Sequence, residues 1–575
     1  MTHRYLCGPQ CVRNIVGLLL AISLFSTIGA LGLSGEDRDK DRDRDDHRAH
    51  FTPDNLVLSR SVYDNNAANV TVGEILPPGC TAKCKPAVSN GTYPFVWNND
   101  LADSSFGITS RILLDELNPR NGKLIGSFEV PNSSQPGAAG KDQMVTSFSS
   151  KSELALNLST DGERLTFMGY VSPIDALDVS NSNTPGVVDP TNPVSETDYR
   201  AVAELDVEGR IHFTETNAYS GNNGRAAILN NLDGANVLYL AGNAGNGANP
   251  QPAGVIEGAG AQFLIPSFEE EAGQTPSNPP TPLASFNVTQ LGLKADKTGK
   301  DTNFRGLTVY NNVVYLTKGS GGNGINTVYF VDTTDTVCGT NVGVGLPAPG
   351  VALPTSSLAY DPTQVATKGL VPYNMCVLKG FPQTLASTDT TFFPFGIWFA
   401  NATTLYVAQE GDGINTFDPV SGKYSDAAAQ TTAGIQKWVF NTTAGAWQLA
   451  YTLSAGLNLG VPYVVPGYPT GNNPSNNNLP WAPATDGVRN ITGKLNHDGT
   501  VILYGITSTV SGNGDQGADP NKLVTITDSL KATTPGTETF TTLRTAGFGE
   551  VLRGVSFTPG SHRDDSDRKG DRDDD

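Results

Sequence analysis

Charge is scarce in this 575-residue sequence, and positive charge most of all. Charged residues make up 17% of the chain, with 38 Lys and Arg against 57 Asp and Glu, a formal net charge of −19. Nucleic-acid binding needs a basic footprint, and an anionic membrane surface attracts basic segments, so the composition argues against both partners. The 63 Gly and 37 Pro, with abundant Thr, Asn and Ser, are typical of an extracellular β-protein.

The common catalytic signatures are also missing. The sequence contains no G-x-S-x-G, no H-E-x-x-H and no P-loop. Between residues 51 and 560 the only histidines are His212 and His497, which argues against a serine triad. Catalysis would need carboxylates, Tyr or Arg, as in a lyase acting on acidic sugars, or a metal held by carboxylates. The acidic stretches 410–413 and 513–519 offer oxygens to Ca²⁺, but neither has the spacing of a twelve-residue calcium loop, so no cofactor is predicted.

Long apolar runs are absent except for one near the start, at residues 15–33. It follows a segment that contains Arg4 and Arg13 and no acid, and Ala30 and Gly32 offer a cleavage point. These features predict a signal peptide over residues 1–32. An uncleaved anchor is the alternative, because the run just reaches bilayer-spanning length. We expect an exported monomer, free or associated with a wall or matrix, without stable membrane insertion.

Cysteine is rare, and two of the six cysteines, Cys7 and Cys11, lie in the expected signal peptide. The other four allow three pairings, of which we favour the two local ones, Cys80–Cys84 and Cys338–Cys376. A metal site at the first pair lacks a nearby Cys or His to complete four ligands. Sequons, which predict a glycoprotein if the host is eukaryotic, occur at Asn69, Asn90, Asn132, Asn157, Asn287, Asn401, Asn441 and Asn490.

Two charged tails flank the body of the chain, at residues 33–50 and 561–575. They contain EDRDKDRDRDDHR and RDDSDRKGDRDDD. Opposite charges that alternate without apolar residues cannot form a core, so we expect both tails to be disordered. They would act as solubilising tails or as an ion-dependent attachment to a charged matrix or to other copies.

Between the tails, at residues 51–560, one unit recurs: a short strand, a tight Asn, Asp or Gly turn, and a strand rich in Val, Leu and Tyr. Its copies begin at residues 153, 225, 305, 395 and 489. Antiparallel hairpins repeated at a roughly fixed period predict a β-propeller, in which each copy supplies strands A and B of a blade. The segment 434–453 is typical of a C–D hairpin, because apolar and polar residues alternate about its turn.

A sixth copy is divided between the two ends of the body. Residues 551–560 have the pattern of strand A, residues 50–63 that of strand B, and residues 111–130 that of strands C and D. The sequence therefore predicts an all-β fold, a six-bladed β-propeller closed by one C-terminal strand and three N-terminal strands. Closure removes the exposed edges of an open sheet. Seven blades remain the alternative if a long insertion hides a degenerate blade.

These segments carry a resemblance to a known family. FTPDNLVLSR, ILLDELNPRNGKLIGSFEVP, PFGIWFANATTLYVAQEGDG, GIQKWVFNTTAGAWQLAYTL and LRGVSFTPG, in this order, resemble a family of secreted β-propeller proteins of unassigned function. The resemblance covers most of residues 51–560. It implies an architecture but no activity, and no catalytic residue is transferred from it.

Loop lengths point to one face of the predicted propeller. The long segments 64–110, 170–199, 409–433, 454–488 and 507–521 are nearly all B–C or D–A connections, which emerge on one side, here called the long-loop face. The exception is the segment 338–376, between strands C and D. Connections this long are usually functional or disordered. We therefore expect the site on the long-loop face.

Four arginines are the main candidates there. Arg225, Arg305, Arg489 and Arg553 each open a strand A, and strands A line the central channel. Guanidinium groups at the channel mouth would bind a carboxylate, sulfate or phosphate. The alternative is that each arginine braces the ring through a neighbouring acid or loop carbonyls.

The loop 460–481 adds Tyr463, Tyr468 and Trp481 among Pro, Gly and Asn. Flat rings beside amide groups suit the faces of sugars, although the same rings could instead fix the loop to the propeller. We therefore predict a protein that binds an extracellular glycan or another anionic ligand. The alternatives are a lyase or a lactone or ester hydrolase at the same face, and a structural matrix protein.

Overall fold

A computed structural model describes the body of the chain, which forms one compact unit within residues 49–575. The described residues are 50–80, 84–95, 107–135, 143–148, 154–187, 194, 196–232, 234–243, 260–276, 280, 284–286, 303–319, 324–332, 337, 343–348 and 375–561. The expected signal peptide, nearly all of both tails, Cys7, Cys11, Cys338 and Asn287 lie outside them.

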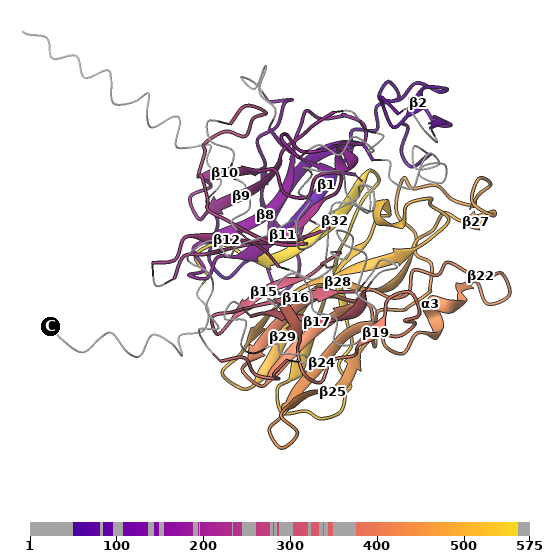
Figure 1. The fold of residues 1–575 in the computed structure, drawn as a ribbon. Coiled ribbons are helices and arrows are strands. Elements are labelled where there is room, and N and C mark those ends of the chain that lie inside the picture. Colours follow the sequence, from indigo (N-terminus) through magenta and orange to yellow (C-terminus); the bar gives the residue numbers. More distant parts are fainter. Residues whose placement is uncertain are drawn as a thin grey trace, which may run out of the picture. The chain divides into compact units, whose positions relative to one another are not determined.

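Antiparallel sheets make up almost all of the secondary structure among the described residues (Figure 1). One four-stranded sheet contains β11 (Gly224–Asn230), β12 (Val237–Gly242), β13 (Ala261–Leu264) and β14 (Ala284–Phe286). A second contains β20 (Pro394–Asn401), β21 (Thr404–Gln409), β24 (Gly434–Asn441) and β25 (Ala446–Leu453). A third contains β28 (Ala484–Leu495), β29 (Thr500–Val510), β30 (Lys522–Ser529) and β31 (Thr541–Thr545).

A five-stranded sheet repeats this meander with one strand added. It runs through β15 (Leu307–Tyr310), β16 (Val313–Lys318), β17 (Ile325–Val331) and β18 (Met375–Val377), and β19 (Thr384–Leu385) pairs with β17. In these four sheets the innermost hairpin begins where the sequence repeat predicts it. The all-β fold is confirmed, and the ring of small sheets indicates a β-propeller.

The remaining blade-like strands form one nine-stranded sheet. Its path is β10 (Ile211–Thr216), β9 (Arg200–Asp206), β8 (Arg164–Val171), β6 (Met144–Ser147), β4 (Thr109–Leu117), β1 (Leu56–Val62) and β32 (Glu550–Phe557). Off this path, β5 (Leu124–Glu129) pairs with β4, and β7 (Asn157–Leu158) pairs with β8. Because β6 pairs with both β4 and β8, the sheet is continuous, and the count of six blades stays a prediction.

The two ends of the body meet inside this sheet, as the sequence predicts. Strand β1 pairs with β32 from Leu56 opposite Phe557 to Val62 opposite Glu550. On its other side β1 pairs with β4, and β4 pairs with β5. The first and last strands of the body therefore lie side by side, so that β1 is paired on both sides and β32 is the last strand on the path of the sheet (Figure 1).

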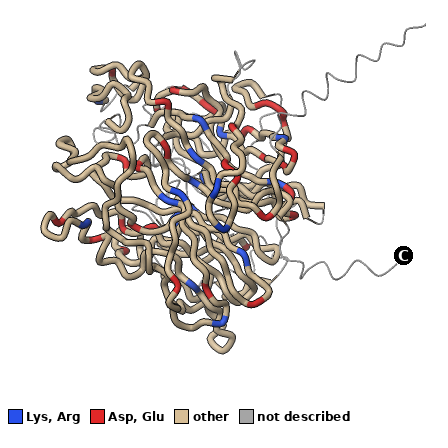
Figure 2. The backbone as a smooth tube through the Cα atoms, turned by 180° about the vertical axis from the view of Figure 1, so that it is seen from behind, with Lys and Arg blue, Asp and Glu red and all other residues tan. Residues whose placement is uncertain are grey.

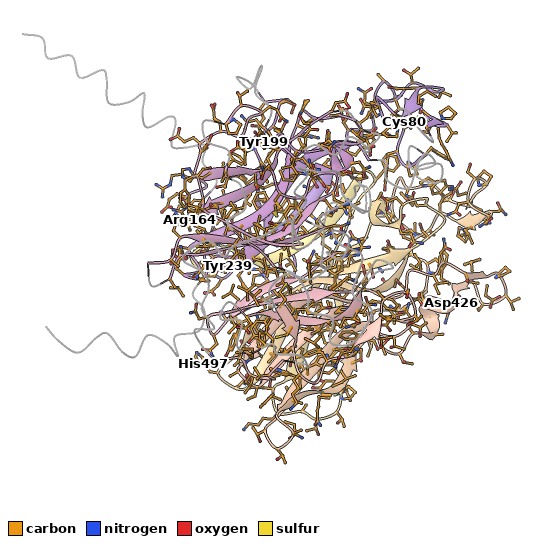
Figure 3. The ribbon with its side chains drawn as sticks, in the orientation of Figure 1. Cys80, Arg164, Tyr199, Tyr239, Asp426 and His497 are labelled. Atoms are coloured by element: carbon orange, nitrogen blue, oxygen red, sulfur yellow. A yellow bond between two sulfur atoms is a disulfide. The ribbon has the colours of Figure 1, made fainter. Side chains whose placement is uncertain are left out.

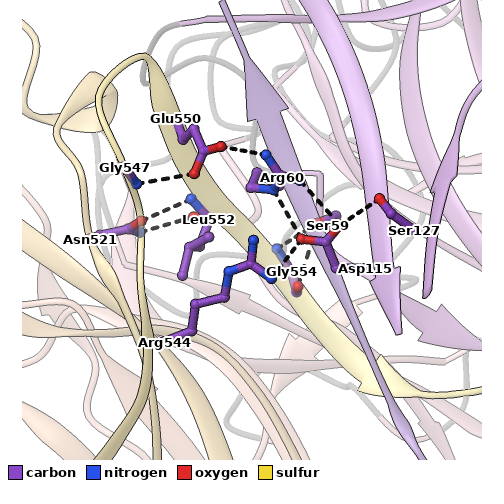
Figure 4. A network of polar contacts seen from close by, with 10 residues as sticks. All are labelled: Ser59, Arg60, Asp115, Ser127, Asn521, Arg544, Gly547, Glu550, Leu552 and Gly554. Atoms are coloured by element: carbon purple, nitrogen blue, oxygen red, sulfur yellow. Dashed lines mark hydrogen bonds and ion pairs between the residues drawn. The ribbon is translucent and has the colours of Figure 1, made fainter. Parts of the chain in front are cut away.

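A buried ionic network reinforces this junction (Figure 4). Arg60 Nε lies 3.0 Å from Asp115 Oδ2, and Arg60 Nη1 lies 2.5 Å from Glu550 Oε1. Arg544 Nη1 reaches the same Asp115 oxygen at 2.9 Å, and the Ser127 hydroxyl donates to Asp115 Oδ1. The Asp115 side chain is fully buried. We call Arg60, Asp115, Arg544 and Glu550 the terminal clasp, since it joins strands from the two ends of the body.

Close packing between the inner strands explains why Gly306, Gly396 and Gly554 stand at equivalent positions of the repeat. A Cβ atom on Gly396 would lie 2.7 Å from the Arg489 carbonyl oxygen, and one on Gly554 would lie 2.5 Å from that of Leu154. The Gly554 N–H donates to Ser59 Oγ at 2.7 Å, and this hydroxyl donates to the Leu154 carbonyl at 2.9 Å. Neighbouring inner strands therefore touch through their backbones.

The same hydroxyl bridge recurs in the five-stranded sheet. The Gly306 N–H donates to Thr317 Oγ1 at 2.8 Å, and Thr317 Oγ1 donates to the Phe395 carbonyl of the next sheet. Repetition of one side-chain bridge at equivalent positions shows that the sheets are related by the sequence repeat and not only by similar strand order.

The extra secondary structure of the long segments lies on one side of the unit. It comprises β2 (Ile75–Leu76) with β3 (Lys85–Pro86), β22 (Phe417–Asp418) with β23 (Lys423–Tyr424), α3 (Ser425–Ala429), and β26 (Asn472–Asn473) with β27 (Leu479–Pro480). Figure 1 shows β2, β22, β27 and α3 on the same side. Figure 3 shows Cys80 and Asp426 on that side and His497, in the turn before β29, on the other. These positions match the predicted long-loop face.

One predicted disulfide is present and the other is described only at one end. Cys80 and Cys84 are bonded, as predicted. Cys376 on β18 also takes part in a disulfide, and its predicted partner Cys338 lies outside the described residues. Within the part of the chain that the structure describes, no helix is long and apolar enough to cross a membrane.

Candidate functional site

The four predicted arginines fall into two pairs with different surroundings. Arg225 and Arg553 are buried, at 4% and 3% exposure. Arg225 Nη1 donates to the Asn303 side chain and to the Phe304 carbonyl. Arg553 donates to Ser61 Oγ at 3.1 Å and to the Gly517 carbonyl at 3.0 Å. These contacts fit the bracing role, because the guanidinium groups hold loop backbone in place.

Arg305 and Arg489, by contrast, are partly exposed and share one aromatic ring. The guanidinium carbon of Arg305 lies 5.3 Å from the centroid of Phe395, and that of Arg489 lies 5.6 Å from it. Phe395 opens β20, on the sheet between theirs, and is fully buried. The ring attracts both cations. It therefore lets two like charges, one from the sheet on each side of its own, come close together. In Figure 2 several Lys and Arg positions gather near the centre, whereas Asp and Glu positions spread over the loops.

A carboxylate meets this arginine pair from the end of strand β21. Glu410 Oε2 lies 3.2 Å from Arg489 Nε, and the two side chains are 12% and 21% exposed. The backbone of Glu410 is fixed on both sides: its N–H donates to the Phe393 carbonyl, and its carbonyl accepts from Ser508 Oγ. The ion pair is therefore formed by a rigid strand end, and it reaches the surface.

Two further carboxyl groups lie behind Glu410. Asp486 is buried, its Oδ2 accepts from the Gly413 N–H at 2.9 Å, and its Oδ1 accepts from Gln430 Nε2 at 2.5 Å. Gln430 Nε2 also donates to Asp412 Oδ1 at 3.2 Å. We call Arg305, Arg489, Glu410, Asp412 and Asp486 the arginine–carboxylate cluster.

Burial controls the charge of this cluster. Desolvation raises the pKa of Asp486 to about 8, against the smaller opposing effect of the Gly413 N–H. Desolvation also raises the pKa of the half-exposed Asp412. At neutral pH Asp486 is therefore mainly a neutral acid. Gly411, with φ +90°, lets the loop approach so closely, because a Cβ atom there would overlap the Asp486 carboxyl group.

Only part of this cluster could be predicted from the sequence. It pointed to Arg305 and Arg489, and it marked 410–413 as an oxygen-rich stretch for Ca²⁺. Asp486 carried a usable signal, since it lies three residues before Arg489 at the end of a long loop. Gln430 carried none, because its contacts depend on how the segment 409–433 folds back. Among the described residues, no group of three or more His, Cys, Asp or Glu is arranged to hold a metal ion.

The predicted aromatic platform lies inside the protein. Trp481 and Tyr468 are only 2% and 5% exposed. The Tyr468 ring packs 5.8 Å from Tyr93, and Trp481 packs 5.2 Å from Phe95. Tyr463 is partly buried and donates to the Pro520 carbonyl. Two of the three rings therefore fix the loop 460–481 to the segment 64–95, and their faces are not open to a sugar.

The second acidic stretch is also used internally. Asp515 Oδ1 accepts from the Gly517 N–H at the start of the short η3 helix (Gln516–Ala518). Asp519 is buried and accepts from the Tyr468 hydroxyl at 3.0 Å. Desolvation raises the pKa of Asp519 to about 7. These oxygens order a turn and anchor a ring.

The two histidines of the body lie in separate sheets. His497 is in the turn between β28 and β29, on the side opposite the long loops (Figure 3). His212 is on β10, an outer strand, with its ring 6.5 Å from that of Phe268.

The described inner strands leave little room for a ligand where they meet. A cavity among the inner strands is lined by Ala155, Gly306, Gly396, Asn490 and their neighbours. It leaves about 10 Å³, roughly the room that one water molecule needs. This cavity is therefore too small for a saccharide or another organic ligand.

Comparisons with known proteins leave the chain without a family. No protein-family model and no curated protein matches the sequence. Among solved structures, a polysaccharide lyase, an ulvan lyase in complex with a saccharide, matches with 11% identity and a TM-score of 0.28, over 88% of this chain and 97% of that one. Drosophila semaphorin 1a, extracellular domains 1–2, matches with 9% identity and a TM-score of 0.26, over 74% of this chain and 84% of that one. TM-scores this low do not establish a shared fold, and neither match bears on the function.

Proposed function

We propose that this chain is an exported six-bladed β-propeller that binds an anionic or carbohydrate ligand at the mouth of its channel, on the long-loop face. The observation that carries the proposal is the convergence of Arg305 and Arg489 on the Phe395 ring. Two partly exposed guanidinium groups in a protein of net charge −19 concentrate positive potential at one place. Guanidinium groups in this setting bind carboxylate, sulfate or phosphate through paired hydrogen bonds.

The count of six rests on dividing the nine-stranded sheet in two. Strands β32, β1, β4 and β5 form one antiparallel meander, and β7 to β10 form another. Strand β6 pairs with only two residues at the end of each. With the other four sheets, these two make six units, each beginning at a predicted repeat.

Export is proposed from the N-terminal pattern alone. A charged start, one apolar run and small residues at 30 and 32 are the parts of a signal peptide. The Cys80–Cys84 disulfide agrees with an oxidising compartment. A free glycan or a wall polysaccharide is the ligand class that such a compartment offers.

Binding is tested on a glycan array that contains uronic-acid, sulfated and neutral saccharides. We expect the wild type to bind acidic saccharides, and Arg305→Gln and Arg489→Gln each to lose roughly tenfold in affinity, the scale of a charge-assisted hydrogen bond. The matched control is Arg210→Gln, which removes the same charge from an exposed turn where Arg210 pairs with Asp206 at 2.6 Å. Equal binding by the wild type and both channel-mouth variants would contradict the proposal.

The arginine–carboxylate cluster also favours a second candidate, a lyase or hydrolase at the same face. Asp412 and Asp486 are bridged by Gln430 beside Arg489, so a neutral acid and a carboxylate share one hydrogen-bond chain. Such a pair could move a proton at a bound sugar, with the partly exposed Asp412 as the group that meets substrate. If the wild type forms product from polyuronate and Asp412→Asn does not, the result would support an enzyme. If the wild type binds polyuronate but forms no product, the result would support a binding protein.

A further inference from the structure

The Glu410–Arg489 ion pair has a consequence for the class of ligand. Glu410 belongs to the segment that follows β21, and Arg489 to β28 of the next sheet, so the pair joins two sheets at the channel mouth. Both side chains reach the surface, at 12% and 21% exposure. Because an ion pair that water partly reaches contributes less to stability than a fully buried one, its exchange for another anion would cost the fold little.

Resting on the proposed function, we propose that Glu410 occupies the place of a ligand carboxylate on Arg489, and that the natural ligand is a uronate-type saccharide whose carboxylate displaces it. Arg489 already holds one carboxylate at 3.2 Å, so the site is shaped for this group. A second guanidinium, that of Arg305, lies over the same ring. The two arginines would hold the incoming carboxylate from neighbouring sheets.

Charge balance favours a group with a single negative charge, such as a carboxylate, over a phosphate monoester. The cluster contains two arginines, the carboxylates of Glu410 and Asp412, and the buried carboxyl group of Asp486, which is mainly neutral at pH 7. Replacing the Glu410 carboxylate by one ligand carboxylate leaves the number of charges on Arg489 unchanged. A phosphate monoester, which is close to a dianion at neutral pH, would bring an extra negative charge close to Asp412, which like-charge repulsion disfavours.

The backbone around Glu410 permits the exchange without unfolding. Its N–H and carbonyl are bound to Phe393 and Ser508, so the strand end stays in place when the side chain moves. Gly411 follows at φ +90°, and behind it the loop is held by the Gly413 N–H on Asp486. The movement required is therefore a rotation of one side chain, not of the loop.

The test is the affinity of Glu410→Gln for an oligogalacturonide, with dextran sulfate and neutral dextran as comparison probes. The substitution keeps the size of the side chain and removes its charge, so affinity for the oligogalacturonide should rise about fivefold, the worth of an exposed ion pair. In Arg489→Gln the gain should vanish: the double variant should bind as weakly as Arg489→Gln alone, because both residues act through one contact.

The matched control is Glu208→Gln, which removes an acid paired with Arg210 at 3.0 Å on an exposed turn. It should leave affinity unchanged, and thermal unfolding should show all variants folded. If the wild type binds and Glu410→Gln binds equally or more weakly, the displacement is refuted and the proposed function stands. Dextran sulfate binding as tightly as the oligogalacturonide would refute the ligand class. If neither the wild type nor Glu410→Gln binds an acidic saccharide, both proposals fail, whereas binding by Glu410→Gln alone would support the displacement.

Discussion

Arg553 and Arg489 occupy the same position of the repeat in adjacent sheets, yet one is buried and the other reaches the surface. Arg553 donates to a backbone carbonyl and a hydroxyl, whereas Arg489 pairs with a carboxylate and lies over an aromatic ring. Arg225 resembles the first and Arg305 the second. The repeat brings all four residues to the inner strands, but the loops that arrive from elsewhere decide which arginine braces and which can meet a ligand.

The terminal clasp sets the upper end of this comparison, since its central carboxylate, Asp115, is fully buried between two arginines. Replacing Asp115 by Ala would take this carboxylate away from Arg544 and leave Arg60 with Glu550 as its ion-pair partner. Breaking a buried pair in this way costs about 3–5 kcal/mol. Chemical denaturation of Asp115→Ala should therefore show the largest loss of unfolding free energy among the variants considered. If the loss of unfolding free energy were smaller than that expected for a solvent-exposed ion pair, the clasp would not hold the two ends of the body together.

We expect the next largest loss of stability at the bracing arginines. Arg553→Gln shortens the side chain and leaves the Gly517 carbonyl and Ser61 hydroxyl without their donor. An unsatisfied buried polar group costs about 1–3 kcal/mol, so the melting temperature should fall. Arg305→Gln, at a partly exposed position, should change it by much less. Equal losses in the two variants would remove the distinction between bracing and exposed arginines.

Asp486, the buried acid near the Glu410–Arg489 ion pair, predicts that the stability of the protein depends on pH. The folded pKa of Asp486, about 8, lies above its unfolded value, so folding takes up a proton there. The stability that this proton gives is complete below the unfolded pKa and is lost as pH rises through the folded pKa. Asp519 and Glu204, whose pKa values are raised to about 7, act in the same direction.

The unfolding free energy should therefore be greater at pH 5 than at pH 8, and Asp486→Asn should flatten this slope. The amide of Asn can take the place of the protonated acid if the Gln430 amide turns over, so that the Gln430 oxygen accepts a hydrogen bond from it. Asp418→Asn, at the end of β22 on the same segment, is the control. An unchanged slope in Asp486→Asn would show that this carboxyl group is ionised in the folded protein.

The sequence predicted the features that depend only on neighbouring residues or on the repeated unit. Alternation and turn residues placed the hairpins, and the similarity of residues 551–560 and 50–63 to strands A and B placed the pairing of β32 with β1. The Cys80–Cys84 pair followed from its short spacing. Each of these needs only neighbouring residues or a repeated unit.

The site required contacts that no local pattern contains. Trp481 and Tyr468 had the composition of an exposed sugar platform, but Phe95 and Tyr93, almost 400 residues earlier, cover them. The four arginines were one set in the sequence, and they separate because Asn303 and Gly517 reach two of them. Asp486 is made neutral by burial under a loop that carries its own acids. The long loops between the repeated strands therefore determine the chemistry of the site. The packing of these loops does not repeat along the sequence, so the repeat could not predict it.

The most direct test of the central claim is the binding isotherm of an oligogalacturonide to three folded proteins: the wild type, the double variant Arg305→Gln/Arg489→Gln, and Arg225→Gln. The account predicts that the double variant loses binding, while Arg225→Gln, although less stable, keeps the wild-type affinity below its melting temperature. Wild-type affinity in the double variant would contradict the account, and loss of binding in Arg225→Gln alone would place the site at the bracing arginines.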